Sequence, residues 1–320
     1  MRSRTSYSHQ LIATLALSTM ALLAACGGGG SDKGSSDEPA TPTLAEYTID
    51  DALINESSGL ARSQRRDDLL WTLNDSGGNT ELYAITTQGR HVATLKISSA
   101  LLNYDWEDLA SYQQDGVGYL LIGDMGDNGA IRPLTTYYKV VEPEVTTGDG
   151  VQMLSVTPSA VYLRFYPDGP RDAEALAVDA TENMAYVLSK RDATPMLYRF
   201  SLDAPLPLAL PGAMEALGAI SIPRAPADYA GNVDSFNWAT AMDFDDAGDR
   251  AYVGTLLNGY FYDRQAGESW IAALSRAPRS FDLPDYPQIE AGTFAPGSDS
   301  RIYISSEQLP APLAQLDQPD

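Results

Sequence analysis

Short apolar runs recur along most of the chain, separated by turns rich in Asp, Gly, Asn or Ser. Five runs have a similar form, at 69–75 (LLWTLND), 119–124 (YLLIGD), 184–190 (MAYVLSK), 250–256 (RAYVGTL) and 301–307 (RIYISSE). In four repeats a third run of the same kind follows, at 81–89, 135–143, 196–203 and 259–267. These runs are rich in Tyr and Val, whereas helical periodicity is scarce. The pattern predicts an all-β protein.

A second and more specific repeat opens each of these segments. Its copies are ESSGLA (56–61), DWEDLA (105–110), DAEALA (172–177), WATAMD (238–243) and QIEAGT (288–293), spaced by 49, 67, 66 and 50 residues. Repetition of a three- or four-strand unit predicts a β-propeller, whereas a β-sandwich would not repeat its opening. We expect five four-stranded antiparallel blades, or six if 215–237 contains a degenerate copy. The additional length is assigned to loops at 143–160 and 202–216, and the run at 45–54 is expected to complete the last blade.

Carboxylates recur at fixed positions of this repeat. The first strand of a propeller blade lines the central channel, and alternate side chains of a strand point to the same side. Positions one and three should therefore converge on the axis as the pairs Glu56/Ser58, Asp105/Glu107, Asp172/Glu174 and Gln288/Glu290. The second strands end on further polar residues, namely Asn74, Asp75, Asp124, Lys190 and Glu307. The sequence predicts a funnel rich in carboxylates, with one sector, Trp238/Thr240, that lacks acids.

Calcium suits such a funnel, because Ca²⁺ takes about six to eight oxygen ligands from carboxylates, amides and backbone carbonyls. The loops NDSGGN (74–79) and GDMGDNG (123–129) add Asp, Asn and Gly at strand ends, although such loops are also good β-turns. The predicted ligands are Glu56, Asp75, Asp105, Glu107, Asp124, Asp127, Asp172, Glu174, Glu290 and Glu307. Another use of these acids stays open: they could accept hydrogen bonds from backbone N–H groups of the neighbouring blade.

Enzymatic chemistry is a second possibility at this funnel. Glu107 or Glu174 would hold the metal or act as general base, and Lys190 and Arg132 would stabilise the charge that develops on a phosphoester. The chain has two histidines, one of them in the N-terminal segment, which excludes a multi-histidine zinc site. No nucleophile elbow is present in the sequence, so serine hydrolase chemistry has no support. The sequence leaves open both a binding module and a calcium-dependent phosphoester hydrolase.

The motifs together carry a family resemblance. The set SGLA, LWTLNDSGG, DWEDLA, LIGDMGDN, DAEALAVD, YVLSKR, EAGTF and YISSE resembles secreted bacterial β-propeller lipoproteins, which are loosely grouped with phytase-like and esterase-like propeller sequences. The resemblance covers most of residues 55–308, and NDSGG, DWED and GDMGDN are its more specific pieces. It implies a propeller, residence outside the cytoplasm and, less directly, calcium. It identifies no substrate, and β-propeller phytases are similar to this chain at the level of fold alone.

The N-terminus has the layout of an export signal. Arg2 and Arg4 precede a short apolar run, 11–25, which is too short to span a membrane and is followed by Cys26, the only cysteine. The ending LAAC resembles the lipobox of bacterial lipoproteins, which implies cleavage before Cys26 and acylation of its thiol and amine. Gly27 stands where inner-membrane retention signals carry Asp. The resemblance therefore implies the outer membrane of a Gram-negative cell, on its periplasmic or extracellular face.

Three regions follow from these observations: a signal peptide at 1–25, a flexible tether rich in Gly, Ser and Pro at 26–43, and a single propeller domain at 44–320. The chain has 43 acidic and 21 basic residues and a formal net charge of −22. Such a charge repels phosphate backbones and argues against nucleic acid as a partner. We expect a calcium-dependent binding or scaffold module, anchored to the membrane through Cys26, that presents a face to an envelope protein or a glycan.

Overall fold

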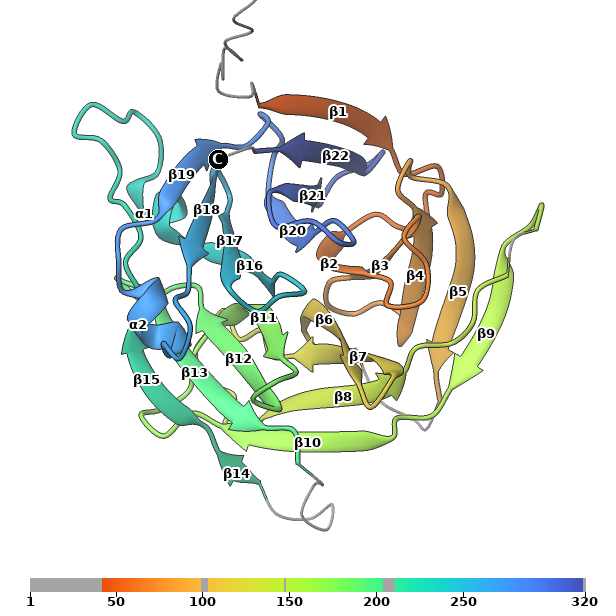
Figure 1. Ribbon diagram of the computed structural model, residues 1–320, viewed down its shortest axis with the longest axis horizontal. Helices are drawn as coiled ribbons and strands as arrows, with labels where there is room; N and C mark the ends of the chain where they lie inside the picture. Colours follow the sequence, from red (N-terminus) through yellow and green to blue (C-terminus); the bar gives the residue numbers. More distant parts are fainter. Residues whose placement is uncertain (1–41, 99–102, 147, 204–210, 319–320) are drawn as a thin grey trace, which may run out of the picture. The chain divides into compact units, whose positions relative to one another are not determined.

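Five β-sheets are arranged around a common axis in the computed structural model of the protein (Figure 1). The structure describes residues 42–98, 103–146, 148–203 and 211–318. Each sheet is one blade of a propeller, and the blades are named A to E in the chain order of their innermost strands. The predicted all-β class and five-bladed propeller are confirmed. Residues 215–237, considered as a degenerate copy, form an outer strand of blade C and a short helix.

Blades A and B are five-stranded sheets. From the axis outward, blade A consists of β2 (Ser57–Arg62), β3 (Leu69–Asn74), β4 (Glu81–Thr86), β5 (His91–Ile97) and β9 (Gln152–Val156). Blade B consists of β6 (Trp106–Gln114), β7 (Val117–Asp124), β8 (Thr135–Val141), β10 (Ala160–Phe165) and β14 (Gly212–Ala213).

The fifth strands of blades A and B differ from the expected four-stranded antiparallel blades. β9 pairs parallel with β5, and β14 pairs parallel with β10. Both come from the segments 143–160 and 202–216, which the sequence assigned to loops. The fourth strand of a blade leaves a row of N–H and C=O groups unpaired, and a returning segment satisfies them.

Blades C, D and E have four strands each. Blade C consists of β11 (Ala173–Asp179), β12 (Met184–Ser189), β13 (Met196–Ser201) and β15 (Glu215–Ala219). Blade D consists of β16 (Ala239–Phe244), β17 (Arg250–Thr255), β18 (Asn258–Asp263) and β19 (Arg279–Asp282). Blade E consists of β20 (Ile289–Phe294), β21 (Arg301–Ser306), β22 (Pro312–Asp317) and β1 (Thr43–Thr48). Two short helices accompany them, α1 (Val233–Asn237) and α2 (Trp270–Leu274), and no helix in the described ranges has the length and apolar character to cross a membrane.

The N-terminal strand closes the ring. β1 lies outside β22 and pairs with it antiparallel, from Thr43 opposite Asp317 to Thr48 opposite Pro312 (Figure 1). Blade E is therefore built from both ends of the described chain. The expectation that the run near 45–54 completes the last blade is confirmed, with the strand itself ending at Thr48. Because the two ends are hydrogen-bonded to each other, the ring cannot open without breaking this ladder.

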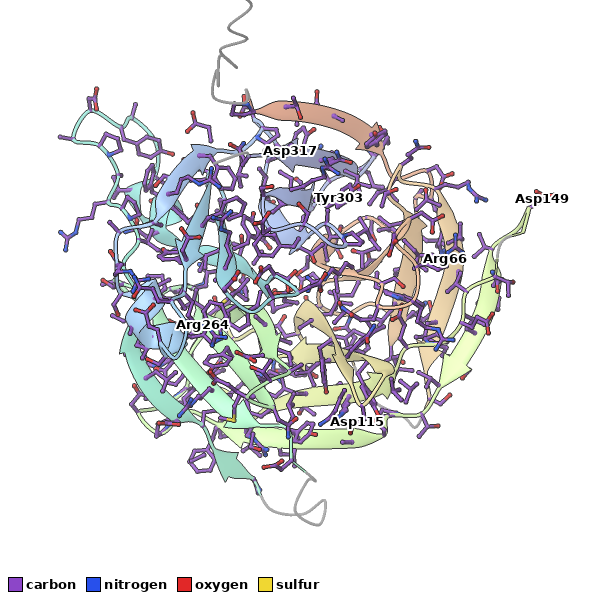
Figure 2. The ribbon with its side chains drawn as sticks, viewed as in Figure 1. Arg66, Asp115, Asp149, Arg264, Tyr303 and Asp317 are labelled. Atoms are coloured by element: carbon purple, nitrogen blue, oxygen red, sulfur yellow. The ribbon has the colours of Figure 1, made fainter. Side chains whose placement is uncertain are left out.

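The hydrophobic core lies between neighbouring blades. Five clusters of buried side chains each draw on two adjacent blades. Side chains fill the spaces between the sheets throughout (Figure 2). Every residue of β2, β11, β16 and β20 is buried, because these innermost strands have neighbours on both faces. Burial on both faces explains why the sequence shows short continuous apolar runs instead of alternation.

The direction of the inner strands defines two faces of the propeller. β2, β6, β11, β16 and β20 contact one another in this order around the axis, and β20 contacts β2. In each blade the inner strand begins and the second strand ends on the same face, because the two strands are antiparallel. We name this side the acid face, since the predicted carboxylates lie there. The side on which the inner strands end is the opposite face.

Candidate functional site

Each of the five inner strands carries a β-bulge at the third position of the sequence repeat. The pairing with the second strand shifts by one residue at Ser58, Glu107, Glu174, Thr240 and Glu290. A bulge leaves its residue out of the ladder and turns its side chain away from the regular alternation. The repeat therefore places one re-oriented side chain per blade at the acid face.

The two hydroxyl residues among these five connect neighbouring blades. Ser58 Oγ donates a hydrogen bond to the backbone oxygen of Glu107, at 2.5 Å, and so ties blade A to blade B. Thr240 Oγ1 donates to the backbone oxygen of Ile289, at 2.9 Å, and so ties blade D to blade E. The other three bulge residues are buried carboxylates, whose charge must be balanced at the axis.

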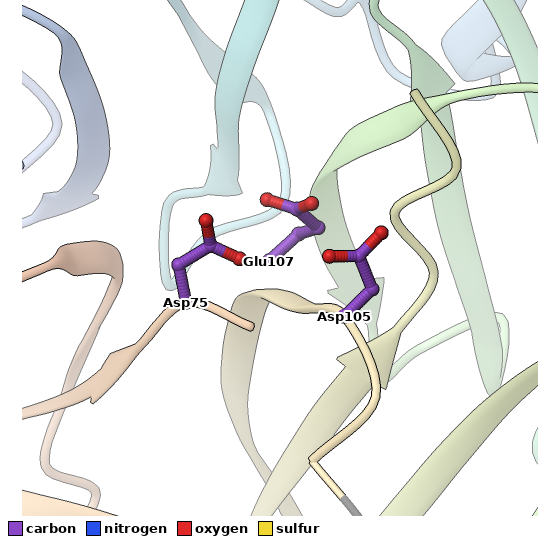
Figure 3. Close-up of side chains that lie close together, drawn as sticks. All are labelled: Asp75, Asp105 and Glu107. Atoms are coloured by element: carbon purple, nitrogen blue, oxygen red, sulfur yellow. The ribbon is translucent and has the colours of Figure 1, made fainter. Parts of the chain in front are cut away.

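Three carboxylates from two blades meet at the acid face (Figure 3). Asp75 follows β3 of blade A, Asp105 precedes β6 of blade B, and Glu107 is the bulge residue of β6. One carboxylate oxygen of each lies within 4.8 Å of the others. At this spacing a single cation can contact all three. We name Asp75, Asp105 and Glu107 the acid triad.

Gly126 lies so close to the acid triad that any side chain there would force the carboxylates to move. A Cβ atom at this position would lie 2.0 Å from Glu107 Oε1 and 2.7 Å from the carboxyl carbon of Asp105. The loop is fixed there by hydrogen bonds from the N–H groups of Met125 and Gly126 to the Asp105 backbone oxygen, at 3.0 and 3.2 Å. The glycine in GDMGDNG therefore keeps space beside two triad carboxylates.

Burial and mutual repulsion both act on the acid triad. Burial raises the pKa of Glu107 well above its usual range, and the charges of Glu174, Asp75 and Asp105 raise it further. Burial, together with the charge of Asp75, raises the pKa of Asp105 to about 6. Burial also raises the pKa of Asp75. Among the described residues, the ion pairs of lysine and arginine at this face involve other carboxylates, so a bound cation would relieve the triad.

A second acid group shares Glu107 with the triad. Oxygens of Glu107, Asp172 and Glu174 also lie within 4.8 Å of one another. Here the chain supplies its own cations, since Lys190 forms an ion pair with Glu174 and Arg191 Nε lies 2.5 Å from Asp172 Oδ2. Side chains of blade C therefore pair with two members of this group, Glu174 and Asp172, and not with Glu107.

Lys190 is the central cation of the acid face. Its Nζ bridges Glu174 of blade C and Glu290 of blade E, the latter at 3.1 Å. Burial alone would lower the pKa of Lys190, but the charges of the two glutamates raise it overall, so the ammonium stays charged. In the sector expected to lack acids, Trp238 places its ring 4.5 Å from the Arg191 guanidinium. The blade D sector is therefore occupied by a cation–π contact.

The other predicted calcium ligands lie outside both acid groups. Glu56 is exposed. Asp127 Oδ2 accepts a hydrogen bond from the backbone N–H of Arg132, at 2.6 Å. Glu307 adjoins Glu290, and burial together with the Glu290 charge raises the pKa of Glu307 to about 9. Of the ten carboxylates expected to bind calcium, the structure brings five into the two groups, Asp75, Asp105, Glu107, Asp172 and Glu174.

Arg132 is engaged with other groups of the acid face. Its Nη2 lies 2.7 Å from Asp124 Oδ1, and its Nη1 donates to the Gly126 backbone oxygen at 2.6 Å. The guanidinium also lies 4.5 Å from the centre of the Tyr104 ring. Arg132 thus holds the Gly126 loop in place, and Asp124, a predicted ligand, serves as its counter-charge.

At the opposite face the channel ends in a network that the sequence did not suggest. Arg62 Nη1 lies 2.6 Å from Asp243 Oδ2, and its Nη2 bonds Asp246 and the Phe244 backbone oxygen. Asp243 also accepts hydrogen bonds from Thr293 Oγ1 and the Phe294 N–H, at 2.8 and 3.0 Å. The sequence did contain a signal for this network: Arg62 and Asp243 each lie at or next to the end of a strand made mostly of small and apolar residues. Charged residues are rarely buried without a partner, so their position indicated an ion pair.

Between the two ends, Asp108 fills the channel. This wholly buried carboxylate accepts hydrogen bonds from the N–H groups of Leu109 and of Leu176 in the next blade, both at 2.8 Å. A Cβ atom at Gly59 would lie 2.8 Å from Asp108 Cα, so blades A and B approach closely at this level. Asp108 and Asp172, which accepts from the Asp127 N–H at 2.8 Å, are acids that bind backbone N–H groups across blades. The alternative use of the repeated acids therefore applies to Asp172, and Asp108, which lies outside the predicted set, acts in the same way.

The opposite face also holds a cavity of about 400 Å³. All five blades contribute to its lining through the segments 62–64, 111–113, 178–181, 244–246 and 296–297. Its principal charged groups are already paired: Arg62 with Asp243 and Asp246, and Asp179 with Arg264 at 3.0 Å. The cavity and the acid triad therefore lie at different ends of this propeller.

Comparison with known proteins supports the fold and gives no information about activity. The chain matches no protein-family model and no curated protein. Among solved structures it is similar to the crystal structure of the major allergen Mala s 1 of Malassezia sympodialis, with a TM-score of 0.50 and 10% sequence identity over 85% of this chain and 96% of that one. At this identity the likeness supports the β-propeller fold alone. The predicted signal peptide at 1–25, Cys26 and all of the predicted tether at 26–43 except its last two residues lie outside the described residues, and Thr43 already belongs to β1.

Proposed function

We propose that the protein is a binding module of the cell envelope whose acid triad takes up Ca²⁺ and whose acid face, with the ion in place, contacts a ligand. The observation that carries this proposal is the convergence of Asp75, Asp105 and Glu107 from two blades, with no paired cation among the described side chains. Taking charges out of water is costly unless they are balanced, and a divalent cation balances them at this place.

The donor set of the triad fits calcium. Three carboxylates offer at most six hard oxygens, and Ca²⁺ accepts mono- or bidentate carboxylates in flexible geometry. Asp75 and Asp105 are partly exposed, so the remaining positions of a bound ion would face water or a ligand. A propeller in general suits a binding or scaffold role, since its loops gather around one axial mouth.

A hydrolytic role has less support from the same residues. A calcium-dependent phosphoester hydrolase would need Lys190 or Arg132 to meet the phosphate. Lys190 bridges Glu174 and Glu290, and Arg132 is held by Asp124 and the Gly126 backbone oxygen. Using either side chain for substrate would leave a buried carboxylate without its partner. Binding is therefore the function that we put forward.

The proposal includes a lipid anchor at Cys26 and residence at the outer membrane. Its support is the LAAC sequence after a short apolar run and the glycine that follows. A Cys26→Ala variant is expected to lose incorporation of labelled palmitate in the producing cell.

Calcium titration of the purified chain tests the proposal. We expect Ca²⁺ at about 100 times its dissociation constant to stabilise the protein by about 2.7 kcal/mol, seen as a rise in melting temperature that a chelator reverses. The double variant Asp105→Asn/Glu107→Gln should lose this rise. Asp67→Asn, which removes one carboxylate at the opposite face, should keep it.

Two outcomes would decide against the proposal. If wild-type protein binds no Ca²⁺ by calorimetry and melts identically with and without chelator, the triad holds protons instead of a cation. If calcium binds and the protein then hydrolyses a phosphoester such as p-nitrophenyl phosphate, the hydrolase replaces the binding module.

A further inference from the structure

Exposed apolar side chains surround the acid face. Five of the large hydrophobic residues with high exposure lie in its loops: Leu53 (64%), Tyr104 (62%), Ile131 (78%), Val233 (55%) and Leu309 (59%). The loops belong to blades A, B, D and E or to the segments that lead into them. We name these five residues the apolar rim. The opposite face also has exposed apolar side chains: Val117 begins β7 with 37% exposure, Val141 ends β8 with 38%, and Leu44 (51%) and Val151 (44%) lie at the outer strands β1 and β9.

The apolar rim is interleaved with the acids of the mouth. Tyr104 directly precedes Asp105, and Leu309 lies two residues after Glu307. Leu53 is fixed next to the triad, because its backbone oxygen accepts a hydrogen bond from Asn74 Nδ2, at 2.7 Å, and Asn74 precedes Asp75. Each of these apolar side chains therefore flanks a carboxylate and not an unrelated part of the surface.

The mouth keeps a negative balance even with one divalent cation bound. Its carboxylates are Glu56, Asp75, Asp105, Glu107, Asp172, Glu174 and Glu290, and the basic side chains among them are Lys190 and Arg191. Asp124 and Arg132 balance each other, and the raised pKa of Glu307 favours its uncharged form. A bound Ca²⁺, Lys190 and Arg191 leave an excess of carboxylates. A ligand with a positive group is therefore complementary to the centre of the face.

Several classes of occupant do not fit this combination. A second copy of the chain would bring an equally acidic face and be repelled, and an anionic membrane surface would be repelled likewise. Sugars are held by flat aromatic rings, and four of the five rim residues, Leu53, Ile131, Val233 and Leu309, are branched aliphatic side chains with no ring to offer. A protein segment can meet both features at once, because its apolar side chains bury the rim and its basic group is complementary to the acidic centre.

We propose that the acid face docks a protein segment that presents a lysine or arginine side chain between apolar side chains. The basic group enters the mouth near Glu56, an exposed carboxylate outside both acid groups, and the flanking side chains cover the apolar rim. This inference rests on the proposed binding function and names the chemical class of its partner.

Selection from a phage-displayed library of random dodecapeptides tests the inference, with the full purified chain as bait in the presence of Ca²⁺. We expect enriched peptides to carry a lysine or arginine flanked by apolar residues. In fluorescence anisotropy, the Ile131→Ser/Leu309→Ser variant should bind the best peptide at least about tenfold more weakly. Met153→Ser, an exposed apolar residue of the outer strand β9, is the matched control and should bind as wild type does.

Three results would overturn the inference. The library could yield no enriched peptide, the enriched peptides could lack a basic residue, or the peptides could bind the rim variant and wild type equally. The rim variant retains the whole acid triad, so its calcium-induced rise in melting temperature should be unchanged. If the wild-type protein binds no calcium and the rim variant still loses peptide binding, the calcium site is refuted and the docking surface is supported.

Discussion

The two ends of the central channel are built from the same five inner strands, yet they balance buried charge in different ways. At the opposite face, Asp243 is paired with Arg62 at 2.6 Å and accepts further hydrogen bonds from Thr293 and the Phe294 N–H. At the acid face, the triad gathers three carboxylates without a paired cation among the described side chains. At the opposite face the chain itself supplies the cation that pairs with Asp243. At the acid face the triad would take its cation from solution.

A cavity alone therefore does not decide where we place the binding site. The opposite face has the cavity of about 400 Å³, but three of its charged groups, Arg62, Asp179 and Asp246, are already in ion pairs. A carboxylate cluster that has lost water and has no partner is held at a cost in free energy, and a cation can remove that cost. The unbalanced end is therefore the one that we assign to binding.

The largest loss of stability is expected when the ion pair at the opposite face is broken. Arg62→Met would leave Asp243 buried without its cation and should lower the free energy of unfolding by about 3–5 kcal/mol. Urea denaturation followed by tryptophan fluorescence measures this loss. The control is Arg301→Met, which removes an exposed pair with Asp317 and should cost no more than about 1 kcal/mol. Equal losses in the two variants would show that the Arg62 network does not stabilise the channel.

A smaller loss is expected when the cation of the acid face is removed. Lys190→Met should cost about 3 kcal/mol at pH 8, the low end of the range for a broken buried pair, because Glu174 and Glu290 can take up protons. The burial that already raises the pKa of Glu174 well above its usual range favours this uptake. The loss should therefore shrink when unfolding is measured at pH 5.5. A loss that is independent of pH would mean that the two glutamates stay ionised without the lysine.

The smallest effect is the pH dependence of the calcium-free triad. Burial and the charge of Asp75 raise the pKa of Asp105 to about 6 in the folded protein, above its unfolded value of 3.8. Between these values the folded state binds more protons than the unfolded state, so stability falls as pH rises from about 4 to about 6. In chelator, wild type should lose on the order of 1 kcal/mol relative to Asp105→Asn across this window, since Asp105 is partly exposed. A constant difference between the two proteins would place the pKa of Asp105 near its ordinary value.

Local patterning allowed much of the fold to be predicted. Short apolar runs separated by turns indicated strands, and the fivefold hexapeptide gave the number of blades. The closing strand was recognised from its position before the first repeat. The fifth strands of blades A and B were not predicted, because β9 and β14 join their sheets through pairing with distant strands, and nothing in their own sequences marks that pairing.

The candidate site was predicted in part. The two-residue spacing in Asp105/Glu107 and Asp172/Glu174 correctly indicated side chains that meet, although the reason is a bulge at the second member and not simple alternation. Glu56 occupies the same position of its repeat as Asp105 and is exposed outside both groups. The hexapeptide determines where each bulge occurs. The neighbouring loops determine whether an acid of the repeat lies close to other carboxylates.

By itself the sequence determined the all-β propeller, its five repeats and the recurrence of acids at one end of the inner strands, because strand period, turn residues and repeats are local properties of the chain. Only the tertiary structure decided which acids are balanced. Arg62 and Asp243 are 181 residues apart, and Lys190 and Glu290 are 100 apart. The energy of a charge depends on its distance to other charges and to water, and those distances are set by how the blades close around the axis.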